Sequence, residues 1–414
     1  MAVVVGEFGV KASELASARE ALIVFAAEMY APLSRRDQRA KGEQYTRGLL
    51  LEGRRKSIVP MAARLPDGDQ QGLQQFIADS PWQDDRVRRR LALRMRREIA
   101  PQGWVVDDSG LPKDGRWSPG VAHQYCGQLG KTANSQVLVS VNAVTDRASC
   151  PLDWRLFLPA SWDQDAERRA RAKIPEEVRH EPKWQLALNI LDGLLGWELP
   201  RQVVQADGGY GDITAFRLGL EERDLEYVVQ VKATTSAQPE QAEPVTPAYS
   251  GRGRPPTARY REKPISLGAL AAAVGRQSTR EVSWREGARG PLTSRFLALR
   301  VRPANEAQRT DDGVLPTRWL LAEWPGHKDE PVKYWLSNLP AETPLERLVV
   351  LAKLRWRIEH DYRELKQCLG LGHYEGRSYP GLQHHLTCVT VAHAFLTCQR
   401  LKRGRDGPPP PAPA

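Results

Sequence analysis

Through the first hundred residues, apolar side chains recur with the period of an α-helix, and turn signals such as Pro66-Asp67-Gly68 divide the pattern. The pattern predicts an all-α domain over residues 1–100. Two basic runs, Arg35–Lys56 and Arg86–Arg97, lie within it, and the second interleaves arginines with apolar residues. One face of such helices can pack while the other contacts phosphates. The segment is therefore either a DNA-binding domain or a helical domain with an ordinary solvated surface.

From residue 101 the apolar pattern changes to short runs typical of β-strands. Three strands are predicted before any helix, and helices then alternate with strands. The predicted strands are Trp104–Val106, Gln136–Val144, Trp154–Leu158, Gln202–Ala206 and Tyr227–Val231, with helices near Lys183–Trp197 and Thr214–Glu222. The order β-β-β-α-β-α-β predicts an α/β (α+β) fold, a mixed sheet with helices on its faces, as in an RNase H-like core. Residues 101–233 form its first part.

Residues 234–264 are rich in Pro, Gln, Ala and Gly, which indicates a loop or linker. Strand-like runs return at Arg295–Val301, Trp319–Trp324 and Val332–Leu336, so 234–340 is predicted to be a β-rich insertion with a Pro/Gly-rich linker.

The remainder of the chain is predicted to be helical. Thr343 is predicted to cap a long helix that has Pro344 at its first position and runs to about Leu369. A last apolar helix covers about Leu382–Leu401, so residues 341–404 complete the core, and 405–414 are a Pro-rich tail.

Charge favours a polyanionic partner. The 414 residues include 60 Lys and Arg against 50 Asp and Glu, a formal net charge of +10. The longest apolar runs are too short to cross a bilayer, and no secretion signal is evident, so a cytoplasmic protein is expected, nucleoid-associated when bound to DNA. Five scattered cysteines without a C-x-x-C pair fit reduced thiols.

One group of residues resembles a set of metal ligands. Cys388, His393 and Cys398 follow one another at five-residue steps, which do not stack on one helical face. Core or surface roles are therefore predicted for them.

Acidic residues follow two of the predicted strands. Asp107 and Asp108 come after Trp104–Val106, and Asp207 comes after Gln202–Ala206. An Asp between a strand and a Gly is often only a turn or capping residue, so each alone allows that interpretation.

The predicted helix from Leu345 carries charge on its apolar side. At about 100° per residue, the stripe that contains Leu345 and Leu348 continues into Arg355, Glu359 and Lys366 within roughly 40°. This side either forms a buried ion-pair network or reaches an active site. If Glu359 met the two strand-end acids, three carboxylates could bind two hard cations for phosphodiester cleavage.

This helix resembles the signature helix of bacterial cut-and-paste insertion-sequence transposases of the DDE superfamily, whose pattern is Y-x-x-R-x-x-x-E-x-x-x-x-x-x-K. Arg355, Glu359 and Lys366 match its R, E and K in identity and spacing, whereas Ala352 stands at the Tyr position. The departure leaves the role of that Tyr without a counterpart.

The resemblance extends to the acids after the strands. Asp107 in a D-x-S context and Asp207 before Gly-Gly-Tyr would be the first and second Asp of the catalytic triad, with Asp108 as the alternate first carboxylate. It also covers the division into a helical DNA-binding region, an RNase H-like core and a β-rich insertion.

The resemblance implies a DNA transposase that binds the ends of an insertion sequence. Asp107, Asp207 and Glu359 would hold two Mg²⁺ ions, with Mn²⁺ able to substitute, to cleave DNA and transfer the 3′-hydroxyl ends to target DNA. Arg355 and Lys366 would contact phosphates. The partners would be double-stranded DNA, both terminal inverted repeats and target, and a second copy of the chain in a homodimer, with no membrane partner. The alternatives are a catalytically inactive DNA-binding repressor and another RNase H-like, structure-specific nuclease.

Two features of the insertion are further candidates for DNA contact. Arg252 and Arg254 lie in Gly251–Pro256, which resembles an AT-hook core that follows a narrow minor groove, or else forms a flexible basic linker. The insertion is also rich in tryptophan, and core packing is expected for most of these residues. Trp284, expected outside the main strands, is the candidate for stacking on an extruded base.

Overall fold

The computed structural model describes residues 12–253, 256–287, 290–304 and 313–406. These residues form two compact units, each described here by itself. The first unit contains the chain up to Pro101, Asp107–Pro200 and the chain from Trp356 onward. The second unit contains Gln102–Val106 and Arg201–Arg355.

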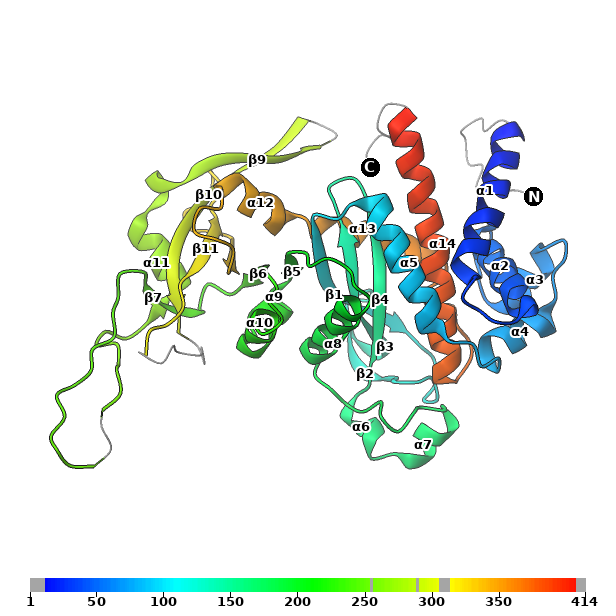
Figure 1. The fold of residues 1–414 in the computed structure, drawn as a ribbon, viewed down its shortest axis with the longest axis horizontal. Helices are drawn as coiled ribbons and strands as arrows, with labels where there is room; N and C mark the ends of the chain where they lie inside the picture. Colours follow the sequence, from blue (N-terminus) through cyan, green and yellow to red (C-terminus); the bar gives the residue numbers. More distant parts are fainter. Residues whose placement is uncertain (1–11, 254–255, 288–289, 305–312, 407–414) are drawn as a thin grey trace. The chain divides into compact units, whose positions relative to one another are not determined.

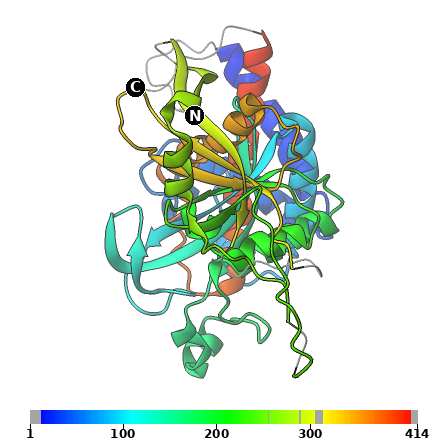
Figure 2. The ribbon, with the colours of Figure 1, turned by 90° about the vertical axis from the view of Figure 1, so that its left-hand side faces the viewer.

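Within residues 12–99, the N-terminal segment of the first unit is built of helices, as predicted. Its helices are α1 (Ala12–Tyr30), α2 (Arg36–Leu50), α3 (Ile58–Arg64), α4 (Gln70–Ala78) and α5 (Asp84–Ile99). Four of them, α1, α2, α4 and α5, contact the last helix, α14 (Tyr379–Asp406). Figures 1 and 2 show these helices, blue to cyan, beside the red α14. The N-terminal helices thus belong to the same compact unit as the C-terminal helix.

The sheet of the first unit has β3 (Lys131–Val144) at its centre, and β1 (Gly103–Pro112) neighbours it. Antiparallel partners of β3 are β2 (Ala122–Cys126) and β4 (Ser149–Phe157), with Val137 opposite Phe157. The helix α8 (Lys183–Gly196) packs on β3 and β4, as does α13 (Trp356–Gln367). The three predicted strands, the predicted helix near 183–197 and the mixed α/β class are confirmed, but β2 was not predicted, so four strands and not three precede the helices.

The first strand is longer than the apolar run suggested. Its buried run is interrupted at Asp107 and Asp108 and resumes at Ser109, and the strand, which neighbours β3, continues to Pro112. The amide of Lys113 still donates to the carbonyl of Asn134 on β3, 3.0 Å away. Asp107 and Asp108 therefore lie within β1, and the expectation that they follow the end of a strand is wrong.

In the second unit, the first residues of β1 run parallel to β5 (Val204–Ala206), which runs parallel to β6 (Tyr227–Val231). Short helices α9 (Gly208–Gly211) and α10 (Thr214–Glu221) connect β5 to β6. Both predicted strands and the predicted helix near 214–222 are confirmed.

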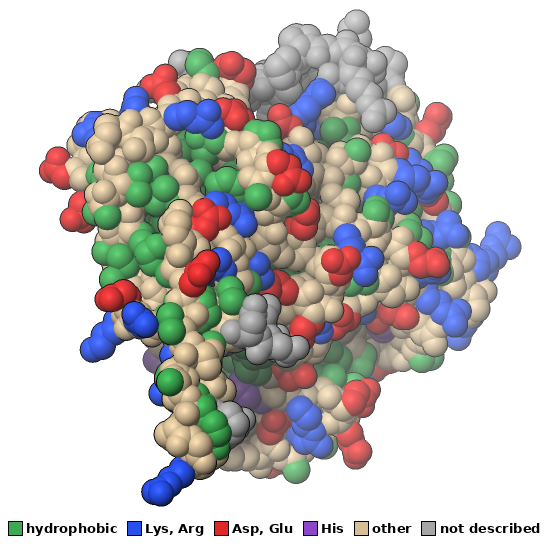
Figure 3. All heavy atoms as spheres, turned by 60° about the vertical axis from the view of Figure 1, so that its left-hand side comes forward, with side chains coloured by type: hydrophobic (Ala, Val, Ile, Leu, Met, Phe, Trp, Pro, Cys, Tyr) green, Lys and Arg blue, Asp and Glu red, His purple; other side chains and the backbone are tan. Residues whose placement is uncertain are grey.

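The insertion extends the sheet of the second unit and is β-rich, as predicted. The strand order is β6-β12-β11-β10-β7-β8, with β9 paired to β10. Its strands are β7 (Ser236–Pro239), β8 (Ile265–Ser266), β9 (Arg280–Gly287), β10 (Gly290–Pro303), β11 (Arg318–Glu323) and β12 (Lys333–Ser337). The helix α11 (Leu267–Val274) and a 3-10 turn (Arg276–Ser278) lie between β8 and β9. On the face drawn in Figure 3, basic and acidic side chains are interspersed over the surface.

The prediction of one long helix from 345 to about 369 is wrong, because the chain forms two helices there, α12 (Leu345–Lys353) and α13. Leu345, Leu348 and Val349 are buried in the second unit, where α12 contacts β6 and β9, whereas α13 contacts β3, β4 and α14 of the first unit. The two halves of the predicted helix therefore pack in different cores, and the chain turns between them at residues 354–355. Thr343 is also not the cap, since Pro344 occupies that position without a side-chain capping bond.

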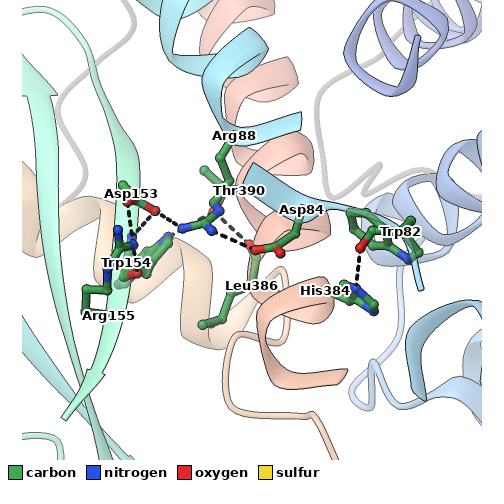
Figure 4. Close-up of polar contacts among 9 residues, drawn as sticks. All are labelled: Trp82, Asp84, Arg88, Asp153, Trp154, Arg155, His384, Leu386 and Thr390. Atoms are coloured by element: carbon green, nitrogen blue, oxygen red, sulfur yellow. Dashed lines mark hydrogen bonds and ion pairs between the residues drawn. The ribbon is translucent and has the colours of Figure 1, made fainter. Parts of the chain in front are cut away.

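Polar contacts within the first unit join the N-terminal helices to the sheet (Figure 4). Arg88 of α5 binds the fully buried carboxylate of Asp153 on β4, and also Asp84, 2.8 Å away. The neighbouring Trp154 donates its indole N–H to Thr390 of α14 at 3.0 Å. Because a buried carboxylate is costly without partners, Asp153 fixes where α5 lies on the sheet.

The cysteines and His393 have the core roles predicted for them. Cys388 and Cys398 are buried on α14 as free thiols, and His393 is fully buried between them. In the described part of the chain, no helix combines the length and apolar character needed to cross a bilayer.

Candidate active site

The two adjacent acids of β1 point to opposite faces of the strand, because side chains alternate along it. The carboxylate of Asp108 forms an ion pair of 2.8 Å with Lys183, the first residue of α8. Asp107 acts more strongly on α13, since its charge contributes more than that of Asp108 to the raised pKa of Tyr362 and also opposes the lowering of the pKa of Lys366. Asp107 thus faces α13 and Asp108 faces α8.

The helix α13 presents Tyr362 and Lys366 to this face of the sheet. The hydroxyl of Tyr362 is 2.7 Å from the hydroxyl of Ser140 on β3, and burial, together with Asp107, raises its pKa well above the ordinary value. The ammonium of Lys366 donates to the carbonyl of Gly110 on β1 at 3.1 Å. Burial lowers the pKa of Lys366.

Glu359 lies on the same side of α13 as these two residues. It precedes Tyr362 by three residues and Lys366 by seven, so at about 100° per residue the three fall within roughly 60°. The side chain of Glu359 is exposed. The helix therefore directs one accessible carboxylate toward the side of β1 that carries Asp107.

The other two acids of α13 are held by partners on α14. Asp361 is 2% exposed and lies 3.6 Å from His393, while Glu364 binds Arg400 through both oxygens. Burial disfavours the carboxylate of Asp361, but the combined effect of His393, Ser149 and Arg357 lowers its pKa. Neither acid lies on the face shared by Glu359, Tyr362 and Lys366.

Asp207 belongs to the second unit, where it follows β5 directly and caps α9. Its carboxylate accepts the amide N–H of Gly209 at 2.9 Å, so the capping role that its sequence context allowed is present. The glycines after it permit close packing, since a Cβ on Gly211 would lie 2.0 Å from the carbonyl of Gln230 on β6. Asp207 is half-buried.

Residues 28–291, more than half of the chain, match the sequence profile of DDE superfamily endonucleases. This chain belongs to the DDE endonuclease superfamily. The matched segment includes Asp107 and Asp207 and ends before Glu359. A probable transposase for insertion sequence element IS701 from Microchaete diplosiphon is 28% identical over 190 residues, 45% of this chain and 47% of that protein. The alignment thus spans about half of the relative's length.

The acids of this DDE endonuclease have the chemistry of hard-cation ligands. Carboxylate oxygens are the donors that Mg²⁺ prefers, and Asp107, Asp207 and Glu359 each remain at least partly accessible. Asp107 and Glu359 belong to the first unit and Asp207 to the second. The described ranges contain no group of three or more His, Cys, Asp or Glu side chains arranged to hold a metal.

The remaining predicted DNA contacts are spread over the second unit. Arg355 lies in the turn between α12 and α13 and is the last residue of that unit. Arg252 is exposed, whereas Arg254 lies outside the described residues.

Trp284 is part of β9, so the expectation that it lies outside the main strands is wrong. Its ring meets Phe296 edge-on, and the ammonium of Lys353 lies 4.5 Å from its centroid. Lys353 also pairs with Glu323 at 2.7 Å. Cross-strand packing with β10 explains why Trp284 joins the sheet. Trp324 and Trp335 are buried, as core packing predicted, while Trp319 is half-buried.

Sequence reasoning missed Tyr362, Ser140 and Lys183. Tyr362 could have been found, because its spacing from Glu359 places it on the same helical face. Lys183 and Ser140 carried no such signal, since their relation to β1 comes only from folding.

Proposed function

We propose that this chain is a DNA transposase that binds the ends of an insertion sequence, cleaves phosphodiester bonds there and transfers the 3′-hydroxyl ends to target DNA. The observation that carries the proposal is the placement of Asp107 on the face of α13 that also bears Glu359, Tyr362 and Lys366. Membership of the endonuclease superfamily and similarity to a probable transposase support it.

Asp107, Asp207 and Glu359 are the proposed ligands of two Mg²⁺ ions, for which Mn²⁺ can substitute. When bound, such ions lower the pKa of water or a hydroxyl nucleophile and stabilise the leaving oxygen. Asp108 is the weaker candidate for the first position, because Lys183 already neutralises its carboxylate on the other face of the strand.

Lys366 and Tyr362 are proposed to position Asp107. The charges of Lys366 and Asp107 interact, and the contact with Ser140 fixes the Tyr362 hydroxyl. Lys366 and Arg355 are also proposed phosphate contacts, for which a point charge and a planar guanidinium are suited.

The wider DNA contacts remain part of the same proposal. The helical segment 1–100 is proposed to bind the terminal inverted repeats, with the chain acting as a homodimer. Arg252 and Arg254 are proposed to contact a minor groove. Trp284 is the weakest of these proposals, because Lys353 already covers its ring.

The direct test is Mg²⁺-dependent cleavage of DNA that carries the ends flanking this gene, compared between wild type and Asp207→Ala. Cleavage by wild type alone, leaving 3′-hydroxyl ends, is expected. Tight end binding without cleavage in Mg²⁺ or Mn²⁺ would contradict the transposase and favour a DNA-binding repressor. Preferential cleavage of branched DNA over linear ends would favour a structure-specific nuclease instead.

A further inference from the structure

A cluster of arginines and tryptophans lies away from the candidate active-site residues on β1 and α13. It joins the loop after β1 to the short helices α6 (Ala160–Asp163) and α7 (Ala166–Arg171) in the first unit (Figure 1). The guanidinium of Arg116 lies 4.5 Å from the ring centroid of Trp117, and that of Arg171 lies 3.9 Å from the same ring. A third guanidinium, that of Arg168, lies 3.9 Å from the ring of Trp162.

The third arginine holds the cluster together through backbone contacts. Arg168 donates to the carbonyl of Arg116 at 2.8 Å and to that of Val121 at 3.2 Å. The indole of Trp162 donates to the same Val121 carbonyl at 2.9 Å. These bonds fix the loop after β1 against α6 and α7 and hold the Arg168 guanidinium in place.

Three cationic side chains and one nearby acid meet here. Burial lowers the pKa of Arg168, Asp165 opposes this lowering, and the charge of Arg116 repels Arg168 and lowers the pKa by a smaller amount. The closest approach of Asp165 to the Arg168 guanidinium is 3.9 Å, and one of its oxygens also caps α7. Arg116 and Arg171 themselves are exposed. An anionic partner would relieve this repulsion.

The cluster borders a shallow groove of about 380 Å³. Arg116 and Arg168 line it together with His123 and Ser161, which add hydrogen-bonding groups, and with Asp165. Groups of this kind suit an acceptor-rich ligand that lies along the surface.

We propose that the arginine–tryptophan cluster, formed by Arg116, Trp117, Arg168 and Arg171, binds the phosphodiester backbone of DNA. The inference rests on the proposed function and adds a DNA contact surface to it. Planar, weakly hydrated guanidinium groups suit phosphate oxygens, and stacking on an indole orients them before DNA arrives. Contacts of this kind position the duplex without reading its sequence.

The test uses the full-length chain and a duplex that lacks the insertion-sequence ends. Affinity is measured over a range of salt concentrations for wild type and for the double variant Arg116→Ala/Arg171→Ala. Each lost phosphate contact reduces the slope of log affinity against log salt by about 0.9. The double variant is therefore expected to lose about 1 to 2 units of slope, with thermal unfolding as the check on folding.

Two further variants separate this contact from a general loss of charge. Lys173→Gln removes an exposed cation that already pairs with Asp79 at 3.3 Å, so its slope should equal that of wild type. Arg171→Lys keeps the charge and should keep most of the slope while weakening binding, because the planar stacking group is lost.

If wild type binds the duplex normally and the folded double variant shows an unchanged slope, the proposal that the cluster binds DNA is overturned. The proposed function is not affected by that result. Failure of wild type to bind any duplex would instead contradict the proposed function. Loss of poly-glutamate binding without loss of DNA binding would also overturn the proposal, in favour of an acidic protein partner.

Discussion

Asp107 and Asp108 are neighbours in the chain, yet each faces a different helix. Strand alternation sends one carboxylate to Lys183 on α8 and the other toward Tyr362 and Lys366 on α13. On α13, Glu359 is the accessible acid, whereas Asp361 and Glu364 are held by His393 and Arg400. Chemical identity at the residue scale therefore matters less than the direction of each side chain.

The pair on β1 allows a matched comparison. Asp107→Asn is expected to abolish cleavage, because it removes a proposed metal ligand. Asp108→Asn should retain cleavage and lose only about 0.2–1 kcal/mol of stability, since the partly exposed pair with Lys183 contributes little. Cleavage assays and urea unfolding of both variants check this, and the reverse pattern would assign the first position to Asp108.

On α13, Glu359→Gln is expected to abolish strand cleavage while leaving the affinity for DNA ends nearly unchanged. The substitution keeps the size of the side chain and removes a ligand charge, not a phosphate contact. Glu346→Gln, at an exposed acid in the first turn of α12, is the matched control and should cleave normally. An equal loss of end binding in Glu359→Gln would contradict the assignment.

At the scale of elements, α14 is the helix against which the first unit assembles. Its residues contact α1, α2, α4, α5 and β4, and its histidines bond to other elements. His385 accepts from the hydroxyl of Tyr45 on α2 at 2.8 Å and donates to the carbonyl of Gly370 at 3.0 Å. Both ring nitrogens are thus used by the neutral imidazole.

This arrangement predicts a loss of stability in acid. Burial lowers the pKa of His385 to about 3, so below its ordinary value near 6.5 the unfolded chain binds a proton that the folded chain does not. The free energy of unfolding therefore keeps its full value above about pH 6.5. It falls by roughly 2 kcal/mol between pH 6.5 and 5. Urea unfolding of His385→Gln should show a weaker pH dependence in this range. The exposed His327→Gln should behave like wild type.

At the scale of the whole molecule, the net charge of +10 predicts salt-dependent binding to DNA of any sequence. Log affinity for a generic duplex should fall linearly with log salt concentration, measured by fluorescence anisotropy between 50 and 200 mM, the range over which phosphate contacts are screened. A flat response would mean that phosphate contacts contribute little. On the face drawn in Figure 3, basic and acidic side chains are interspersed, so on this face we expect phosphate contacts to come from local clusters.

The sequence alone determined most of the elements and their order. Tyr227–Val231 was predicted at its observed bounds, and the helices near Lys183 and Thr214 within one residue, because hydrophobic periodicity reports directly on which face of an element is buried. The spacing of Arg355, Glu359 and Lys366 likewise identified the family before any fold was known.

Only the tertiary structure decided how these elements divide between two cores. Periodicity runs without interruption from Leu345 to Lys366, yet the chain turns after Lys353 because α12 packs in one unit and α13 in the other. The sequence pattern along β1 does not show which of Asp107 and Asp108 is the first carboxylate. Only their packing against α13 and α8 distinguishes them. Local sequence specifies which faces are apolar, whereas long-range packing specifies what each face meets.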